Sequence, residues 1–388
     1  MTEKQTNMRK LGLEAAYLIT CALRGTVPVC DGIDLNALYP FCKFHSVTSI
    51  VAMALEEMWK TDPAPEAEMK RWRQARDKAI RKNILLNAER EQILGFLESI
   101  GCWYLPLKGS LLQFDYPKFG MRQMNDNDIL FDEAFQSRIH DFMISRGYEA
   151  AVYQKGNHDE YIRQPVYNFE MHTSLFMKQV SPELDAYYQD IRSRMIKDPS
   201  NQYGYHLSNE DFYIYLVAHD FKHYQYSGIG IRSLMDSYVY LQKHGTELNW
   251  EYIFGELEKF GASAFEKQCR VLSQKLFESV NADPELSPED SIVLDEYFTS
   301  GTFGTYENTV RKGVASGENS PTWFTTARYL LRRLFPPVWY MIHMEPWLEQ
   351  KKWLIPWAYV RRLFRGLFLR FRDISRELSL ALRAKSDK

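Results

Sequence analysis

Two aspartates spaced two residues apart, Asp126 and Asp128, are the side chains of this chain best suited to hold a metal ion. Asp128 opens the apolar run at 129–131, which predicts a short strand. Alternate residues of a strand share a face, so both carboxylates would face one way while Asn127 points away. Two neighbouring carboxylates repel each other unless a cation lies between them, and such hard oxygen ligands suit Mg²⁺.

A small-residue turn, Lys108-Gly109-Ser110, precedes the aspartates. Gly109 has no β-carbon, so the backbone there can come close to a polyphosphate. Ser110 could open a helix whose N-terminal amides favour anions. Lys108 and Arg122 could add positive charge against the same polyphosphate. The plainer alternative is that both cations are solvated or paired with a surface carboxylate.

Taken in order, these residues resemble the polymerase-beta-like nucleotidyltransferase superfamily. A closer likeness is to a bacterial family known only as uncharacterised nucleotidyltransferases, and it extends through residues 43–47 and 219–236 over most of the chain. The motifs that carry it are Lys108-Gly109, Tyr116-Pro117, Gly120-Met121-Arg122, Asp126-x-Asp128-Ile129-Leu130 and Phe169-Glu170-Met171-His172. The resemblance implies an α+β fold, with a small mixed-sheet nucleotidyltransferase core flanked by N-terminal and C-terminal helical regions.

The resemblance also implies a third carboxylate on a neighbouring strand, and the stretch Tyr167–His172 offers Glu170. Alternation there puts Phe169 and Met171 toward the core, and Glu170 and His172 on the opposite face. The alternative is that the two aspartates form a polar turn and that Glu170 is an ordinary solvent-facing strand residue.

The roles that the resemblance implies follow from nucleotidyl transfer. An acceptor hydroxyl attacks the α-phosphorus of a nucleoside triphosphate (NTP), and pyrophosphate leaves. Asp126 and Asp128 would bind two Mg²⁺ ions, and Glu170 would hold the acceptor-side ion and lower the pKa of the acceptor hydroxyl. Gly109 and Ser110 would cradle the phosphates. A small molecule, a sugar or a protein side chain could each be the acceptor.

Two departures from the superfamily pattern support a second hypothesis. Asn127 occupies a position that is usually apolar, and the spacer from Ser110 to Asp126 is slightly long. Neither departure removes a ligand, but both are compatible with a catalytically weak or inactive nucleotide-binding or scaffold protein that has the same fold.

Composition excludes several other classes of protein. A net charge of −2 over 388 residues argues against a binder of duplex nucleic acid, which would need basic residues near its site. The five cysteines contain no CxxC pair, so they indicate neither a disulfide framework nor a zinc ribbon, and a reducing cytoplasm fits best. The first residues lack the apolar core of a signal peptide, and no run of eighteen apolar residues occurs.

Residue patterns divide the chain into four predicted regions. Helical spacing dominates the first, short apolar runs the second, and helical spacing returns in the third. Individual helices are predicted at 66–99, 133–146 and 209–226. The regions are an N-terminal helical region at 1–100, the nucleotidyltransferase core at 101–180, a helical domain at 181–320, and a basic, Trp-rich helical segment at 321–388.

Histidines offer further candidates. His219 and His223 lie four apart on the predicted helix at 209–226, with Asp220 beside them. The string differs from the zinc-binding HExxH motif in having Asp for Glu, and no third ligand is evident. The pair could border the nucleotide cleft or be buried and structural. His172, on the face of Glu170, could contact the acceptor or a metal-bound water, or simply be a structural histidine.

The segment from Pro321 to the C-terminus differs from the rest in charge. It has 14 Lys and Arg against 5 Asp and Glu, a local charge of +9, and the preceding 320 residues therefore carry −11. It also holds five of the nine tryptophans. We expect it to pack within the protein, and the alternative is peripheral contact with an anionic membrane.

Overall fold

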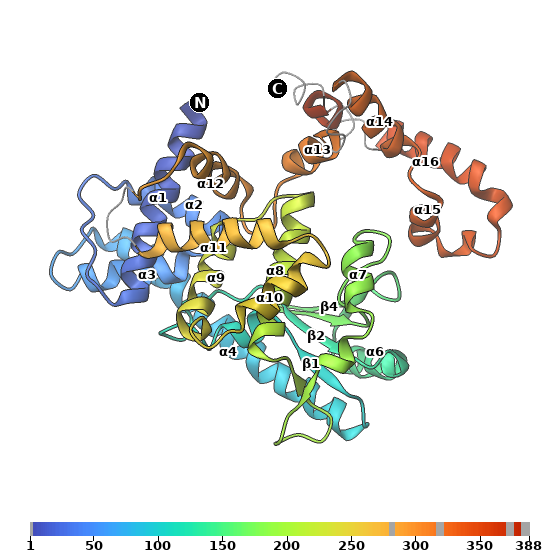
Figure 1. Cartoon of the computed structure of the whole chain (residues 1–388), viewed down its shortest axis with the longest axis horizontal. Helices are drawn as coiled ribbons and strands as arrows, with labels where there is room; N and C mark the ends of the chain where they lie inside the picture. Colours follow the sequence, from blue (N-terminus) through green and yellow to red (C-terminus); the bar gives the residue numbers. More distant parts are fainter. Residues whose placement is uncertain (1–2, 279–283, 316–321, 370–375, 382–388) are drawn as a thin grey trace. The chain divides into compact units, whose positions relative to one another are not determined.

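The computed structural model describes residues 3–278, 284–315, 322–369 and 376–381 (Figure 1). Contacts divide the chain into two compact units. The first comprises Met1–Lys222 and Ile229–Thr302, and the second His223–Gly228 and Phe303–Lys388. The first unit contains a five-stranded mixed sheet among many helices, so the α+β class predicted from the sequence is confirmed.

Four helices precede the sheet: α1 (Glu3–Arg24), α2 (Leu35–Phe44), α3 (Thr48–Met58) and α4 (Glu66–Ser99). Asp34 caps α2, because its side chain accepts hydrogen bonds from the backbone N–H groups of Asn36 and Ala37. Glu66 and Glu68 place negative charge in the first turn of α4, where the helix dipole favours it. The predicted helix at 66–99 is α4, with the same bounds.

The sheet has the strand order β1-β2-β5-β4-β3. Its strands are β1 (Tyr104–Pro106), β2 (Asn127–Phe131), β3 (Glu149–Val152), β4 (His158–Arg163) and β5 (Tyr167–His172). β2 and β5 run parallel, and the other neighbouring pairs run antiparallel. In the parallel pair Asp128 lies opposite Glu170, and Leu130 lies opposite His172. Directly opposed residues share a face, so this register brings the two acids together.

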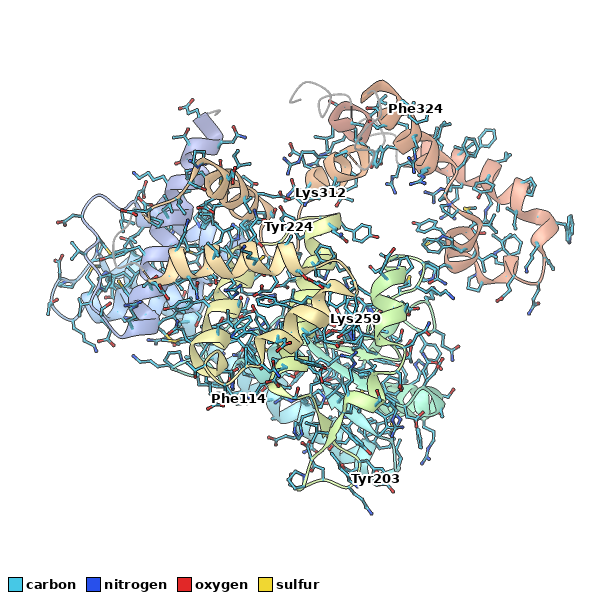
Figure 2. The ribbon with its side chains drawn as sticks, in the orientation of Figure 1. Phe114, Tyr203, Tyr224, Lys259, Lys312 and Phe324 are labelled. Atoms are coloured by element: carbon cyan, nitrogen blue, oxygen red, sulfur yellow. The ribbon has the colours of Figure 1, made fainter. Side chains whose placement is uncertain are left out.

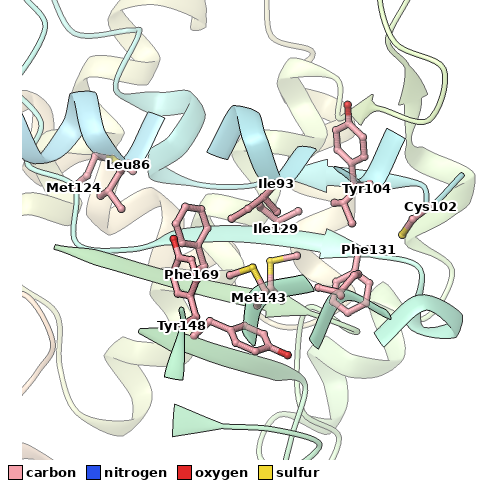
Figure 3. Close-up of a cluster of buried hydrophobic side chains, with 14 residues drawn as sticks. Leu86, Ile93, Cys102, Tyr104, Met124, Ile129, Phe131, Met143, Tyr148 and Phe169 are labelled. Atoms are coloured by element: carbon pink, nitrogen blue, oxygen red, sulfur yellow. The ribbon is translucent and has the colours of Figure 1, made fainter. Parts of the chain in front are cut away.

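One face of the sheet is apolar and is covered by α4 and by α6 (Gln136–Ser145), which follows a 3-10 turn at Glu133–Phe135. Phe169 and Met171 are fully buried on this face, as their alternation predicts. Figure 3 shows the side chains gathered between these helices and the strands. The cluster includes Leu86, Ile93 and Leu97 of α4, Ile129 and Phe131 of β2, Tyr161 of β4, and Ile139 and Met143 of α6.

Asn127 lies on this apolar face, away from the carboxylates. It is fully buried, and its Oδ1 accepts a hydrogen bond of 3.0 Å from Arg90 Nη1, which also donates to Asn87 Oδ1 at 2.8 Å. A buried amide needs such partners, and α4 supplies one for the oxygen, whereas Nδ2 is buried with no hydrogen-bond partner among the described residues. The departure of Asn127 from the superfamily pattern is therefore matched by a polar group behind the sheet and leaves the carboxylate face unchanged.

The remaining helices of the first unit surround the sheet and the N-terminal helices. Tyr215 and Lys222, both of α8, lie near the polar face of the sheet, as the effect of the Asp128 charge on each of them indicates. The elements are α5 (Gly109–Leu112), α7 (Pro182–Tyr188), the 3-10 turn Ile191–Arg194, a two-stranded sheet of β6 (Ile196–Lys197) and β7 (Tyr205–His206), α8 (Asn209–Tyr226), α9 (Ile231–His244), α10 (Trp250–Glu258), α11 (Ser263–Glu278) and α12 (Pro288–Ser300).

The second unit is helical. Lys312 donates a hydrogen bond to the backbone carbonyl of Tyr224, and its ammonium lies 3.9 Å from the centroid of the Tyr224 ring (Figure 2). Glu377 accepts hydrogen bonds from Arg333, Tyr306 and Tyr329. The helices are α13 (Tyr306–Ala315), α14 (Thr322–Leu334), α15 (Val338–Met344) and α16 (Ile355–Leu369), with 3-10 turns at Pro346–Leu348 and Lys352–Leu354. None of the helices in the described ranges combines the length and apolarity that crossing a bilayer requires.

His45 joins the end of α2 to α12 in the first unit. The ring is fully buried, and its Nε2 donates to the backbone carbonyl of Phe298 at 3.0 Å. Its Nδ1 is buried with no hydrogen-bond partner among the described residues. Burial lowers the pKa of His45 from 6.5 to about 4, although the hydrogen bond to Phe298 opposes the shift.

This histidine predicts a loss of stability in mild acid. Between pH 6.5 and about 4 the unfolded chain protonates His45 and the folded chain does not, so stability is complete above that range and falls within it. We expect the free energy of unfolding of the first unit to fall by about 2 kcal/mol from pH 7 to pH 5 through this residue. His45→Gln, which keeps a donor for Phe298, should lose that part of the pH dependence in urea unfolding. If the free energy of unfolding of His45→Gln still fell between the two pH values by as much as that of the wild type, this account would be contradicted.

Lys108, between β1 and α5, has φ +47, a backbone conformation that favours glycine. A glycine could not supply the ion pair that this side chain makes, in which Lys108 Nζ donates to Asp128 Oδ1 at 2.6 Å. A strained backbone that carries an ion pair of this kind is typical of a functional position.

The strain can be measured apart from the charge. Lys108→Gly and Lys108→Ala both remove the ammonium, but only glycine tolerates positive φ without cost. Urea unfolding should therefore find Lys108→Gly more stable than Lys108→Ala by about 1 to 2 kcal/mol. Equal stabilities would mean that the turn relaxes without strain.

Candidate active site

The polar face of the sheet gathers Asp128, Glu170 and His172. His172 Nε2 lies 3.0 Å from Asp128 Oδ1 and 3.5 Å from Glu170 Oε2. Asp128 is only 2 % exposed, and His172 is likewise buried. Asp126 immediately precedes β2, and the charges of Asp128 and Glu170 act on it. The structure therefore brings the three predicted carboxylates to one place, with a histidine between two of them.

Lys108 compensates the most deeply buried acid. Its ammonium and the imidazole of His172 both contact the same oxygen, Asp128 Oδ1. Burial alone would raise the pKa of Asp128, but the charge of Lys108 and the hydrogen bond from His172 hold it well below its usual range. Asp128 is thus ionised.

The other two carboxylates respond differently to the same surroundings. Burial, together with the negative charge of Asp128, raises the pKa of Asp126 to about 6. Burial also acts to raise the pKa of Glu170, but the hydrogen bond from His172 and the charges of Lys108 and His172 together outweigh it, and the pKa is lowered. A divalent cation beside these acids would offset the repulsion that Asp126 experiences, so the donor set fits Mg²⁺.

Arg122 lies behind the turn at Gly109. Its Nε and Nη2 donate to the two oxygens of Asp236, at 2.9 Å each, and Tyr116 donates to the same carboxylate. A β-carbon at position 109 would lie 2.1 Å from Arg122 Nη1. Glycine is therefore required here by the guanidinium that packs against it. The described contacts of Arg122 support the turn, and the hypothesis that it adds positive charge against a polyphosphate stays a prediction.

Ser110 also serves the turn. Its hydroxyl is buried and donates to the backbone carbonyl of Leu107 at 2.7 Å. Gln113 closes α5 by donating from its side chain to the carbonyl of Ser110 at 3.0 Å. The hydroxyl of Ser110 is thus occupied within the turn, and the role of Gly109 and Ser110 as a phosphate cradle stays a prediction.

The predicted histidine pair on α8 is divided between the two units. His219 belongs to the first unit, where its Nδ1 lies 3.5 Å from Asp220 Oδ1. His223 begins the segment that groups with the second unit. Asp220 accepts a hydrogen bond from Ser233, while burial, with the charge of Asp236 adding to it, raises the pKa of Asp220 to about 6.

Two cations near the carboxylates, Lys222 and Lys82, escaped the sequence-based prediction, whereas Arg232 was considered as a residue that could face the cleft or pair with Asp236. The charges of Asp128 and Glu170 act on Lys222, whose pKa falls to about 8 through burial and the nearby Lys108. The negative charge of Asp126 likewise acts on Lys82 and on Arg232. Spacing on α8 could have revealed Lys222, since it lies three residues after His219 and seven after Tyr215, on the same helical face.

Lys82 and Arg232 also hold the segment that leads into β2. Lys82 Nζ donates to the carbonyl of Asn125 at 2.9 Å, and Arg232 Nη1 donates to the carbonyl of Gln123 at 3.4 Å. An open pocket lined by Lys82, Asn125 and residues 162–168 lies next to Asp126 in the chain. Asn168, on the face of Glu170, has a buried Oδ1 without a hydrogen-bond partner among the described residues. The pocket thus offers a cation and an amide beside the acids.

Comparison with known proteins identifies a family. A family described as "uncharacterised nucleotidyltransferase" matches residues 31–278, well over half of the chain. No curated protein and no solved structure matches. The matched residues include the three carboxylates, Lys108, Arg122 and α8. The chain therefore belongs to the family of uncharacterised nucleotidyltransferases, as the resemblance of its motifs predicts.

Proposed function

We propose that this protein transfers a nucleoside monophosphate from a Mg²⁺-bound NTP to a hydroxyl group of an acceptor, with release of pyrophosphate. The observation that carries the proposal is the register of the parallel strands, which puts Asp128, two residues after Asp126, opposite Glu170. Acidic side chains that converge on one face provide the oxygen ligands on which two-metal transfer depends.

Each carboxylate has a distinct part in this proposal. Asp126 and Asp128 would hold two Mg²⁺ ions, and Glu170 would help to hold the ion on the acceptor side. Bound Mg²⁺ would stabilise the negative charge that develops on the phosphoryl oxygens. Lys108 competes with a cation for Asp128 Oδ1, so cation binding would turn its ammonium toward the triphosphate.

The neighbouring residues would position the two substrates. Lys82, Lys222 and Arg232 supply positive charge around the carboxylates, where a triphosphate needs it. Arg122 would act through the turn at Gly109 rather than on phosphate itself. The sugar or base of the nucleotide would occupy the pocket that borders Asn125.

The hypothesis of a non-catalytic nucleotide-binding or scaffold protein has less support. Asn127, one of its two arguments, contacts Arg90 on the opposite face of the sheet. Calorimetry with NTP and Mg²⁺, followed by a search for pyrophosphate, separates the two hypotheses. Binding of nucleotide without turnover across a broad panel of acceptors would favour the scaffold.

The sheet offers a matched pair of variants for testing the catalytic role of Glu170. Glu160 of β4 lies directly opposite Glu170 in the antiparallel register, and the two glutamates share a face of the sheet. We expect Glu170→Gln to reduce nucleotidyl transfer at least about 100-fold, because a ligand of the acceptor-side metal ion is lost. Glu160→Gln should retain activity.

The assay uses each of the four NTPs, labelled at the α-phosphate, with cell extract as the source of acceptor. Label should appear on an acceptor together with free pyrophosphate. Transfer from a γ-labelled NTP instead would mean that the protein is a phosphotransferase, and equal losses in the two glutamate variants would refute the role of Glu170.

We also propose that the C-terminal segment contacts an anionic membrane. Within this segment, Met341, Leu348 and Ala358 form a small buried cluster of their own. Trp353, however, is 77 % exposed, and other large apolar side chains of the segment are exposed as well. They include Trp347, Trp357, Val360 and Phe364, and the exposed basic residues among them are Lys351, Lys352 and Arg365. Tryptophan favours the membrane interface, and lysine and arginine favour anionic lipids.

Vesicle sedimentation of the full chain tests this second proposal. The protein should bind vesicles that contain phosphatidylglycerol more tightly than pure phosphatidylcholine vesicles, and salt should weaken the binding. Trp353→Ala and the double variant Lys351→Glu, Lys352→Glu should each reduce it, with Trp103→Ala as the control in the first unit. Equal binding to both lipids, or none, would refute the proposal.

A further inference from the structure

Two histidines and a glutamate lie together beside the aspartates. His158 of β4 lies directly opposite His172 of β5, and Glu170 precedes His172 by two residues, so all three share the polar face of the sheet. One ligand atom from each of the three lies within 4.8 Å of the other two. The two imidazole rings have their centroids 5.0 Å apart.

One ring nitrogen of His158 is unsatisfied. Its Nδ1 is buried and has no hydrogen-bond partner among the described residues. Leaving a buried polar atom unpaired costs about 1 to 3 kcal/mol. A metal ion bound at Nδ1 would remove that cost, because a neutral imidazole nitrogen is a good metal ligand.

His172 is positioned by two carboxylates. Its Nε2 lies 3.0 Å from Asp128 Oδ1 and 3.5 Å from Glu170 Oε2, so one nitrogen is directed at two carboxylates. A cation that displaces the proton on this nitrogen would have a carboxylate oxygen on either side. The cluster therefore continues directly into the row of acids.

We propose that His158, Glu170 and His172 bind a borderline metal ion such as Zn²⁺ or Co²⁺ in preference to Mg²⁺. Imidazole suits the transition metals, whereas Mg²⁺ takes oxygen ligands. Metal–nitrogen bonds of about 2.0 to 2.1 Å place ligand atoms roughly 3 to 4 Å apart, so small ring rotations would close the present spacing. Three protein ligands leave coordination positions open for a substrate oxygen.

This inference deepens the proposed function, because Glu170 would be shared between the two sites. The acceptor-side ion would then differ in kind from the ion held by Asp126 and Asp128. Metal binding itself does not depend on nucleotidyl transfer. It can therefore be tested without an NTP or an acceptor.

The experiment titrates the full chain, freed of metal with a chelator, with Co²⁺ and follows the visible absorption of the bound ion. Zn²⁺ should displace the Co²⁺, and a large excess of Mg²⁺ should not. His158→Gln should weaken Co²⁺ binding at least about tenfold, since even residues that only support a ligand contribute that much. His140→Gln is the control, because His140 lies on α6 and contacts Tyr161, whose side chain belongs to the opposite face.

A second readout guards against a variant that fails to fold. Zn²⁺ should raise the melting temperature of the wild type and of His140→Gln, but not that of His158→Gln, whose melting temperature without metal should match the wild type. Equal Co²⁺ binding by His158→Gln, or displacement by Mg²⁺, would overturn the inference. If the wild-type protein binds Co²⁺ at this site but shows no nucleotidyl transfer, the proposed function is refuted and the metal site is not.

Discussion

The parallel pairing of β2 with β5 is the constraint on which the candidate site depends. It puts Asp128 opposite Glu170 and leaves His172 between them. Because successive strand residues face opposite sides, a slip of one residue would turn Glu170 into the apolar layer. Burial of Phe169 and Met171 against α4 and α6 opposes that slip, so the hydrophobic core holds the acids in register.

Burying acidic side chains requires compensation, and the chain provides it from several elements. Lys108 meets Asp128 from a strained turn, and Arg122 behind that turn is neutralised by Asp236. Charged groups that lose water are costly unless they are paired with good geometry. The pKa of Asp126 is raised by burial and by the negative charge of Asp128, and a bound cation would relieve that repulsion.

The donor atoms on the polar face differ in chemical kind along the sheet. Carboxylate oxygens dominate at β2, and imidazole nitrogens join Glu170 where β5 meets β4. Hard and borderline ligands select different metal ions. One sheet can therefore present two metal environments a few residues apart, with Glu170 as the group that belongs to both.

The sequence by itself determined the local features of this protein. Apolar spacing predicted α4 with its observed bounds, and alternation along β5 predicted that Glu170 and His172 share a face opposite Phe169 and Met171. Such periodicities are local, so they can be recognised in a single sequence. Family motifs added the three carboxylates and the class of protein.

The tertiary structure decided which side chains pair with one another. The sequence identified Lys108 and Arg122 as cations but not that one pairs with Asp128 and the other with Asp236. It also gave no sign that His158 lies opposite His172, because that depends on β4 entering the sheet beside β5. Strand order and helix docking join residues far apart in the chain, and no local pattern encodes those contacts.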